Sequence, residues 1–270
     1  MVLTLYPLGR SLALSFFVTE YGFEGARFVG LLNYERLFSD RFFLRAIRNT
    51  ISFTLLATLG ELALGLGLAL LANRGFRGRR VLIPVLVAPF ILSTMVVTAI
   101  WSAWFHYDFG YLNNLLRAVG LEGVEWLSSP RIALYSLVLV DIWQTTPLVF
   151  LILLAGLQSI DPALYEAARL DGAGRGRILW TITLPLLLPH LMLAALLRSI
   201  DSFKIFDKVY ALTGGGPGQA TETLSMFLFR QGFRFQEMGA ASATAMVMVA
   251  IAAVLAGVYA AMILRGGKEG

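Results

Sequence analysis

Long apolar runs separated by short polar segments dominate this chain. Five of these runs contain at most three charged residues each: 50–72, 81–105, 132–157, 186–206 and 239–264. A helix needs about 20 mostly apolar residues to cross the roughly 30 Å of hydrocarbon in a bilayer. The pattern therefore predicts five membrane-spanning helices, and the Ala, Gly and Ser residues of 239–264 favour close helix packing.

The first nineteen residues form a further apolar run, interrupted by Arg10. A central arginine costs about 2.5–3.5 kcal/mol on insertion scales. The run also lacks the basic start and the small-residue cleavage site of a signal peptide. We expect a sixth span over 1–19, shortened at its beginning if Met1 is a late start. The prediction is an all-α integral membrane protein with one transmembrane domain over 1–270.

The distribution of basic residues predicts the orientation. The segment "NRGFRGRR" (73–80) has four arginines and no acid, which is typical of a cytoplasmic loop. Alternation then places the N-terminus and 158–184 in the cytoplasm, and 20–49, 106–131 and 207–238 outside. The first outer segment weakens this orientation because it contains five arginines: Arg27, Arg36, Arg41, Arg45 and Arg48.

Composition agrees with a membrane protein. Only 14% of the residues are charged, against about a quarter in a soluble domain. We attribute the net charge of +5 to topology and anionic headgroups, and not to nucleic acid, because no basic face with interleaved aromatic residues occurs. The absence of cysteine excludes disulfides and thiolate metal sites.

The polar segment 158–184 interrupts the apolar pattern between two spans. Asp161 and Pro162 predict a helix start, and Gly172 after Asp171 predicts its end. A second short helix is expected over 175–183, before Pro185 and the next span. Helices this short are marginal alone in water, so they must rest on lipid headgroups or on another protein. The residues alone leave both alternatives open.

This segment resembles the signature of bacterial ABC importer permeases: E-A-A, three residues, G, nine residues, then I-x-L-P. The matching positions are Glu166, Ala167, Ala168, Gly172, Ile182, Leu184 and Pro185. In that family the loop is a coupling helix held in a cleft of the ATPase subunit. The resemblance therefore makes these residues candidate coupling residues: Glu166, Ala167, Ala168, Arg169, Asp171 and Gly172.

The resemblance covers most of the chain and narrows to the first permease of carbohydrate importers of the maltose, trehalose and glycerol-phosphate type. It rests on "FVGLLNYERLF" (28–38), "RNT" (48–50), "DIWQTTP" (141–147), "LAGLQSI" (154–160), "FDKVYALTGGGPGQATETL" (206–224) and "FRFQEMGAASA" (233–243). The second permease of those systems shares the E-A-A loop but lacks the glycine-rich segment. The maltose permease itself has extra N-terminal spans and a large periplasmic insert, which these 270 residues do not contain.

The resemblance also implies the assembly. A different second permease would complete the pore, two ATP-binding subunits would carry ATP and Mg, and a periplasmic or extracellular binding protein would deliver the sugar. The chain itself would bind no cofactor, and the complex would sit in the inner or plasma membrane of a bacterium or archaeon.

Polar residues inside spans usually face a cavity or another helix. In the fifth span Arg198, Asp201, Lys204 and Lys208 recur at three- or four-residue spacing, so Arg198–Asp201 and Asp201–Lys204 pairs are expected. Related sugar permeases build their cavity from this span and from "DIWQTTP". The candidate substrate-path residues are Asp141, Trp143, Thr145, Asp201, Ser202 and Lys204, with Ser93 and Thr94 from the third span.

Structural roles compete with this interpretation. Trp143 could simply pack between helices, and 201–208 could lie near the outer headgroups. We expect Glu61 to form an interhelical hydrogen bond and not to belong to the substrate path.

The sequence argues against an enzyme. The Gly267-Lys268 pair is followed by Glu269 and does not complete a phosphate-binding loop. His106 and His190 lack metalloprotease spacing. The alternatives are an ion-coupled transporter using Asp141, Asp201 and Glu61, or an ABC permease for a solute such as phosphate or peptides.

Overall fold

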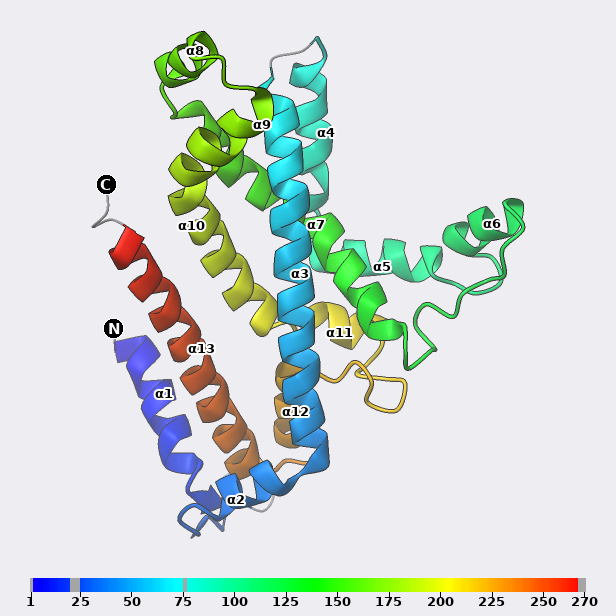
Figure 1. Cartoon of the computed structure of the whole chain (residues 1–270). Coiled ribbons are helices and arrows are strands. Elements are labelled where there is room, and N and C mark those ends of the chain that lie inside the picture. The colour runs from blue at the N-terminus through cyan, green and yellow to red at the C-terminus, as the bar shows by residue number, and fades with distance from the viewer. Residues whose placement is uncertain (1, 20–24, 75–76, 267–270) are drawn as a thin grey trace.

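The computed structural model describes residues 2–19, 25–74 and 77–266, and this part of the chain is mostly helical (Figure 1). The first half contains α1 (Val2–Leu14), β1 (Phe17–Val18), β2 (Arg27–Phe28), α2 (Leu32–Ser39), α3 (Arg41–Asn73), α4 (Arg79–Ile91), α5 (Thr94–Trp104) and α6 (Tyr111–Ala118). The second half contains α7 (Ala133–Gln158), α8 (Pro162–Leu170), α9 (Arg175–Ile178), the π-helix η1 (Leu179–Thr183), α10 (Leu184–Phe203), α11 (Asp207–Leu212), α12 (Leu224–Phe229), the π-helix η2 (Arg230–Arg234) and α13 (Met238–Gly266).

Four helices in the described residues are long and apolar enough to cross a membrane: Arg41–Asn73, Ala133–Gln158, Arg175–Phe203 and Met238–Met262. A fifth crossing is obtained if α4 and α5 are counted as one broken span. The prediction of a mostly helical protein with several membrane-spanning helices is confirmed, although β1 and β2 form a short antiparallel pair. The number of six spans, the cytoplasmic N-terminus and the coupling helix remain predictions.

The expected third span over 81–105 is bent sharply. Its two helices, α4 and α5, meet at an angle of 97°. Pro89 weakens the helical hydrogen bonding before the break, Leu92 is extended, and the Ser93 hydroxyl caps α5. Gln144 of α7 donates a hydrogen bond to the Leu92 carbonyl at 3.2 Å. This side chain satisfies a backbone group that the break exposes, as non-helical backbone at membrane depth requires.

The N-terminal helix is shorter than the span expected over 1–19. It ends at Leu14, and 13 residues rise only about 20 Å. The Asn33 amide of α2 donates to the carbonyls of Ser15 (2.8 Å) and Phe17 (2.9 Å), which holds the chain in its non-helical course. Residues 20–24 of the first outer segment lie outside the described residues. Helix α1 packs along α13 (Figure 1).

The helix expected over 175–183 and the span expected over 186–206 are one continuous structure. Residues Arg175–Phe203 run through α9, η1 and α10 without a break. The π-helical hydrogen bonding of η1 directly precedes Pro185, which has no amide to donate. The wider turn accommodates the proline, so the helix continues where we expected it to stop.

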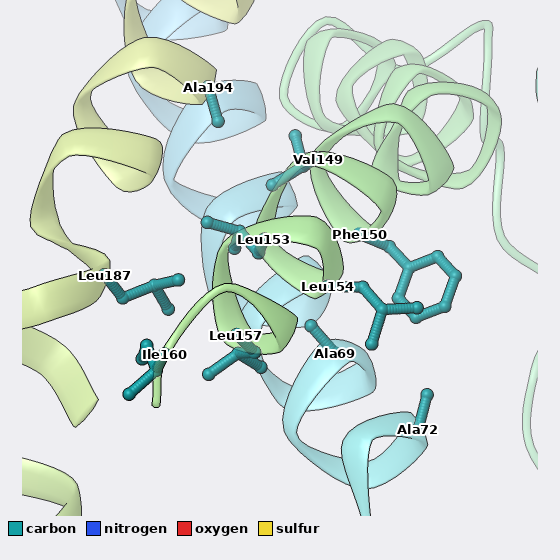
Figure 2. Packing of buried hydrophobic residues seen from close by; sticks show 10 residues of the cluster. All are labelled: Ala69, Ala72, Val149, Phe150, Leu153, Leu154, Leu157, Ile160, Leu187 and Ala194. Atoms are coloured by element: carbon teal, nitrogen blue, oxygen red, sulfur yellow. The ribbon is translucent and has the colours of Figure 1, made fainter. Parts of the chain in front are cut away.

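The main core lies where α7 packs between α3 and α10. Figure 2 shows side chains of α7, including Leu153 and Leu157, filling the space between these two helices. Two glycines permit the close approach. A Cβ atom on Gly65 of α3 would meet Val149 at 2.7 Å, and one on Gly156 of α7 would meet His190 at 2.6 Å. Small residues of α3 and α7 thus allow the close packing of this core.

The two ends of the molecule carry different elements. Helix α8 lies at the same end as the last turn of α3 and the start of α4, whereas α2 and α12 lie at the opposite end (Figure 1). We call these the α8 end and the α2 end. The short antiparallel pair of β1 and β2 also lies toward the α2 end. Helix α8 and the start of α4, which are expected on the same side of the membrane, thus lie at one end, whereas α6 lies between the two ends (Figure 1).

Candidate functional site

Four charged side chains meet in the interior, contributed by α3, α7, α10 and α11. We call Glu61, Asp141, Arg198 and Lys208 the charged cluster; each side chain is at least 95% buried. Arg198 Nε lies 2.6 Å from Glu61 Oε2, and its Nη2 lies 3.1 Å from Asp141 Oδ2. Lys208 Nζ pairs with the other oxygen of Asp141. The four helices are therefore joined through two balanced pairs of opposite charge.

Neutral hydroxyl groups form hydrogen bonds to the cluster. The Thr145 hydroxyl lies 2.6 Å from Glu61 Oε1, and the Ser202 hydroxyl accepts a hydrogen bond from Arg198 Nη2 at 3.1 Å. Buried charges are tolerable only when they are paired and their remaining oxygens are hydrogen-bonded, and the cluster meets both conditions. Glu61 forms the interhelical hydrogen bonds that its position in the second span predicts.

The cluster continues to a more exposed rim on α10. Arg198 Nη1 lies 3.5 Å from Asp201 Oδ2, and Lys204 Nζ lies 3.1 Å from Asp201 Oδ1. Both pairs expected from helical spacing are present. Asp201 and Lys204 are about half exposed, at 52% and 60%. Of the charged candidates for the substrate path, these two can reach a ligand without disrupting the cluster.

Trp143 lies apart from the charged cluster, because positions two residues apart on a helix do not share a face with Asp141. Its ring makes an edge contact with Trp101 of α5 at 5.7 Å between centroids. It also lines a cavity of about 290 Å³ between α3, α4 and α7, together with Thr146 and Phe150. The lining is mainly apolar, so this cavity offers a surface for stacking but few hydrogen-bonding groups.

The candidates therefore separate into distinct places. Asp141 belongs to the charged cluster, Thr145 and Ser202 form hydrogen bonds to it, and Asp201 and Lys204 form its rim. Ser93 is exposed and Thr94 is half-buried, and both lie at the break between α4 and α5. Sequence reasoning did not identify the Gln144 bond to this break, although the amide stands within "DIWQTTP".

Helix α8 has the limits that its sequence predicts. The Asp161 carboxylate accepts a hydrogen bond from the amide of Ala163 at 2.9 Å. At the other end, Gly172 has φ +76° and its amide donates to the Arg169 carbonyl at 3.0 Å, while the amide of Ala173 donates to Ala168 at 2.9 Å. This pair of bonds is the Schellman motif, which needs a residue in the left-handed region at the position of Gly172.

The outward surface of α8 is not covered by the rest of the chain. Glu166, Ala167, Arg169, Asp171 and Gly172 are exposed, and Ala168 is half-buried. Leu170 is 88% exposed. On the inward side, Tyr165 packs against the main core and accepts a hydrogen bond from the Thr183 hydroxyl at 3.4 Å. One face of α8 is therefore anchored, and the other presents charged and apolar groups.

The glycine-rich segment is held on the N-terminal part of α3, at the α2 end. Asn49 Nδ2 donates to the carbonyls of Gln219 (3.3 Å) and Glu222 (3.0 Å). The Thr50 hydroxyl accepts a hydrogen bond from the amide of Leu224 at 2.9 Å. The motifs "RNT" and "GGGPGQATETL", about 170 residues apart in sequence, thus form one unit. No local pattern indicated this contact, because it depends on the tertiary fold.

Glu222 is the buried acid of this unit. The pKa of its carboxyl is raised from 4.5 to about 7, mainly by burial and to a smaller extent by Asp40, although Arg230 and Arg45 oppose the rise. Arg230 Nη2 lies 2.8 Å from Glu222 Oε1. Because the folded pKa exceeds the unfolded one, this group favours folding below about pH 4.5, and its contribution is lost as the pH rises to about 7.

We expect Glu222→Gln to reduce the pH dependence of stability. At pH 8 the wild type carries a buried carboxylate that the variant lacks. We therefore expect the wild type to be less stable than the variant by about 2 kcal/mol at this pH. The measurement is the thermal unfolding midpoint of detergent-purified protein at pH 5 and pH 8. Glu237→Gln, at an exposed position, is the matched control and should resemble the wild type. A pH response unchanged by Glu222→Gln would contradict this assignment.

Comparison with known proteins identifies relatives over most of the chain. Residues 61–265 match the family described as binding-protein-dependent transport system inner membrane component. The sulfoquinovosyl glycerol transport system permease SmoG of Agrobacterium fabrum is 39% identical over 96% of this chain and 84% of its own length. The trehalose/maltose transport system permease MalF of Thermococcus litoralis is 43% identical over 75% of this chain and 68% of its own length.

Solved structures share the fold. A bacterial ABC transporter involved in the import of the acidic polysaccharide alginate superposes with a TM-score of 0.85 at 24% identity, covering 98% of this chain and 91% of the other. The alginate transporter in complex with an alginate pentasaccharide-bound periplasmic protein gives a TM-score of 0.82 at 25% identity, covering 97% of this chain and 86% of the other. The chain belongs to the family of binding-protein-dependent transport system inner membrane components, the permease subunits of ABC importers.

Proposed function

We propose that this chain forms one half of the sugar pathway of an ATP-driven importer and that α8 couples it to ATPase subunits. The observation that carries the proposal is α8 itself. It is a capped helix, anchored at Tyr165, whose E-A-A surface at Glu166–Ala168 is directed away from the chain. Helices this short are marginally stable alone in water, and exposed apolar side chains such as Leu164 and Leu170 are typical of surfaces that bind another protein. We therefore expect a cleft in a partner protein to cover α8.

The topology follows from this role. The α8 end faces the cytoplasm, where the four arginines of 73–80 also belong. We also assign residues 1–19 as a sixth membrane segment with a cytoplasmic N-terminus. The packing of α1 along α13 supports this assignment. The single transmembrane domain then extends over 1–270.

The substrate class is a carbohydrate. The relatives are named for sulfoquinovosyl glycerol and for trehalose and maltose, and the structural neighbours for alginate. We assign the path to Trp143 as an aromatic platform and to the rim residues Asp201 and Lys204 as hydrogen-bonding groups. Asp141, Thr145 and Ser202 act behind this rim, because their side chains bond within or beside the charged cluster. Ser93 and Thr94 border the path at the break between α4 and α5.

The assembly requires several further proteins. A second, different permease completes the pathway, and two ATP-binding subunits supply ATP and Mg beneath α8. A substrate-binding protein delivers the sugar at the α2 end, by analogy with the alginate transporter, which forms a complex with an alginate pentasaccharide-bound periplasmic protein. The complex lies in the inner or plasma membrane of a bacterium or archaeon, in keeping with the family description.

The test is reconstitution. The chain is co-expressed with the binding protein, second permease and ATPase subunits encoded by its own genome, and the complex is placed in proteoliposomes. We expect sugar uptake that requires both ATP and the binding protein, and ATPase activity stimulated by the sugar-loaded binding protein. Uptake driven by an ion gradient without ATP would support the ion-coupled alternative. ATP-dependent uptake of phosphate or peptides, without sugar, would support a permease for another solute.

Trp143→Ala tests the proposed platform. Loss of an aromatic surface for stacking costs about 1–3 kcal/mol by analogy with base stacking, so sugar uptake should fall roughly 5- to 150-fold. The basal ATPase rate should persist, because the ring lies outside the charged cluster. Trp143→Phe retains an aromatic face and should restore most of the uptake. If Trp143→Ala assembles and transports like the wild type, Trp143 is only a packing residue.

A further inference from the structure

A groove of about 680 Å³ lies at the outer end of α3, between this helix and the beginning of α7. We call it the outer groove. Its polar part contains Arg45 and Arg48 of α3 and Arg131, which lies in the segment before α7. Its apolar part contains Leu55 and Leu59, and Tyr135 of α7 lies alongside. Charged and apolar groups are thus segregated within one groove.

The α3 residues of the outer groove share one helix face. Positions 45, 48, 52, 55 and 59 follow spacings of three and four residues, which align them along the helix. At 1.5 Å per residue, Leu59 lies about 16 Å deeper along the axis than Arg48. Leu55 and Leu59 are 56% and 62% exposed. The groove therefore runs from basic groups near the end of a spanning helix to uncovered leucines at membrane depth.

The arginines are available for an anion. The lining of the groove contains three arginines and no carboxylate. In the described part of the chain, Arg48 and Arg131 form no ion pair. Arg45 Nη1 donates to the Gly218 carbonyl at 3.2 Å, so the glycine-rich segment fixes this guanidinium at the rim. Several donors of each guanidinium remain for an oxyanion.

We infer that the outer groove binds an acidic phospholipid of the leaflet at the α2 end. Guanidinium groups match phosphate oxygens in geometry and charge, so the three arginines would hold the headgroup phosphate. An acyl chain would cover the leucines below. The order of the two parts along α3 matches a lipid molecule, whereas a free phosphate or a sugar would leave the leucines uncovered. A lipid site here explains why arginines occur in a segment expected outside, although basic residues in loops are usually cytoplasmic.

Native mass spectrometry of the detergent-purified transporter complex tests the inference. Dioleoyl phosphatidylglycerol is titrated against dioleoyl phosphatidylcholine, with glycerol 3-phosphate as a soluble competitor. The groove variant is Arg45→Gln/Arg48→Gln/Arg131→Gln. The matched control, Arg27→Gln/Arg41→Gln/Arg234→Gln, removes the same charge from exposed positions outside the groove.

We expect the wild type and the control to retain phosphatidylglycerol preferentially. The groove variant should lose roughly fivefold in affinity for each arginine removed, or about 100-fold in all, and should bind both lipids equally. Leu55→Gln/Leu59→Gln should weaken both lipids while preserving the preference for the acidic one. Glycerol 3-phosphate should not displace the bound lipid.

Four results would overturn the inference. The first is that the wild type retains both lipids equally, and the second is that the control and groove variants lose the same affinity for phosphatidylglycerol. The third is that glycerol 3-phosphate displaces the bound lipid. The fourth is that the complex prefers phosphatidylglycerol only when the second permease is absent. Displacement would indicate a site for a soluble anion, and the last result an interface between subunits. If the groove variant does not fold, the comparison of the two lipids on the wild type still tests whether the complex prefers the acidic lipid. The experiment measures lipid retention and not sugar uptake. A negative result would therefore contradict the lipid site without contradicting the proposed sugar transport.

Discussion

Replacing Arg198 by methionine is expected to destabilise the folded chain by about 3–5 kcal/mol. The side chain is 5% exposed and bonds both Glu61 and Asp141. Without it, Glu61 keeps only a hydroxyl donor and becomes an uncompensated buried carboxylate. Methionine fills a similar volume, so the loss measures charge and not packing. The thermal unfolding midpoint and the yield of monodisperse protein in detergent are the measurements.

Two controls isolate the charge effect. Lys204→Met removes a cation six residues away that is 60% exposed and, within the described residues, forms an ion pair with Asp201 alone, so it should cost less than about 1 kcal/mol. The double variant Glu61→Gln/Arg198→Met removes one charge of each sign and leaves Asp141 with Lys208. It should recover more than half of the lost stability. A double variant no better than Arg198→Met alone would show that the buried carboxylate is not the cause.

The sequence predicted those features of the fold that depend on local pattern. Runs of apolar residues located four of the spanning helices, and the spacing of Arg198, Asp201 and Lys204 predicted their pairs. Asp161 and Gly172 predicted both ends of α8 because capping depends on residues within one turn. These predictions succeeded because the interacting groups are neighbours along the chain.

The remaining features depend on contacts that no local pattern reports. Arg198 meets Glu61 across 137 positions, and Lys208 meets Asp141 across 67. The 97° break between α4 and α5 was missed because uniform hydropathy conceals a bend. Pro185 was expected to separate two helices, but a π-helical turn absorbs it. Of the candidate path residues, the sequence could not reveal that Asp141 is committed to an internal pair.

Gly172→Pro is expected to abolish coupling while leaving the membrane helices folded. Proline fixes φ near −65°, whereas Gly172 has φ +76° and its amide donates to Arg169. The substitution therefore removes the Schellman motif and redirects the chain after α8. Because the affected backbone is exposed, the thermal midpoint should change little. Sugar-stimulated ATPase activity should fall at least tenfold, or the ATPase subunits should no longer copurify.

Two control substitutions in the same loop test whether the backbone conformation at Gly172 is the cause, and not the presence of a proline or the loss of a glycine. Gly174 has φ −70°, so Gly174→Pro introduces the same residue at a compatible position and should retain coupling. Gly172→Asn should also retain most of it, because asparagine tolerates the left-handed region and a Cβ at Gly172 meets no atom within 4 Å. If Gly172→Pro transports sugar normally, or if Gly174→Pro fails equally, the end of α8 does not transmit the ATPase movement. The coupling role would then have to be assigned to another surface at the α8 end.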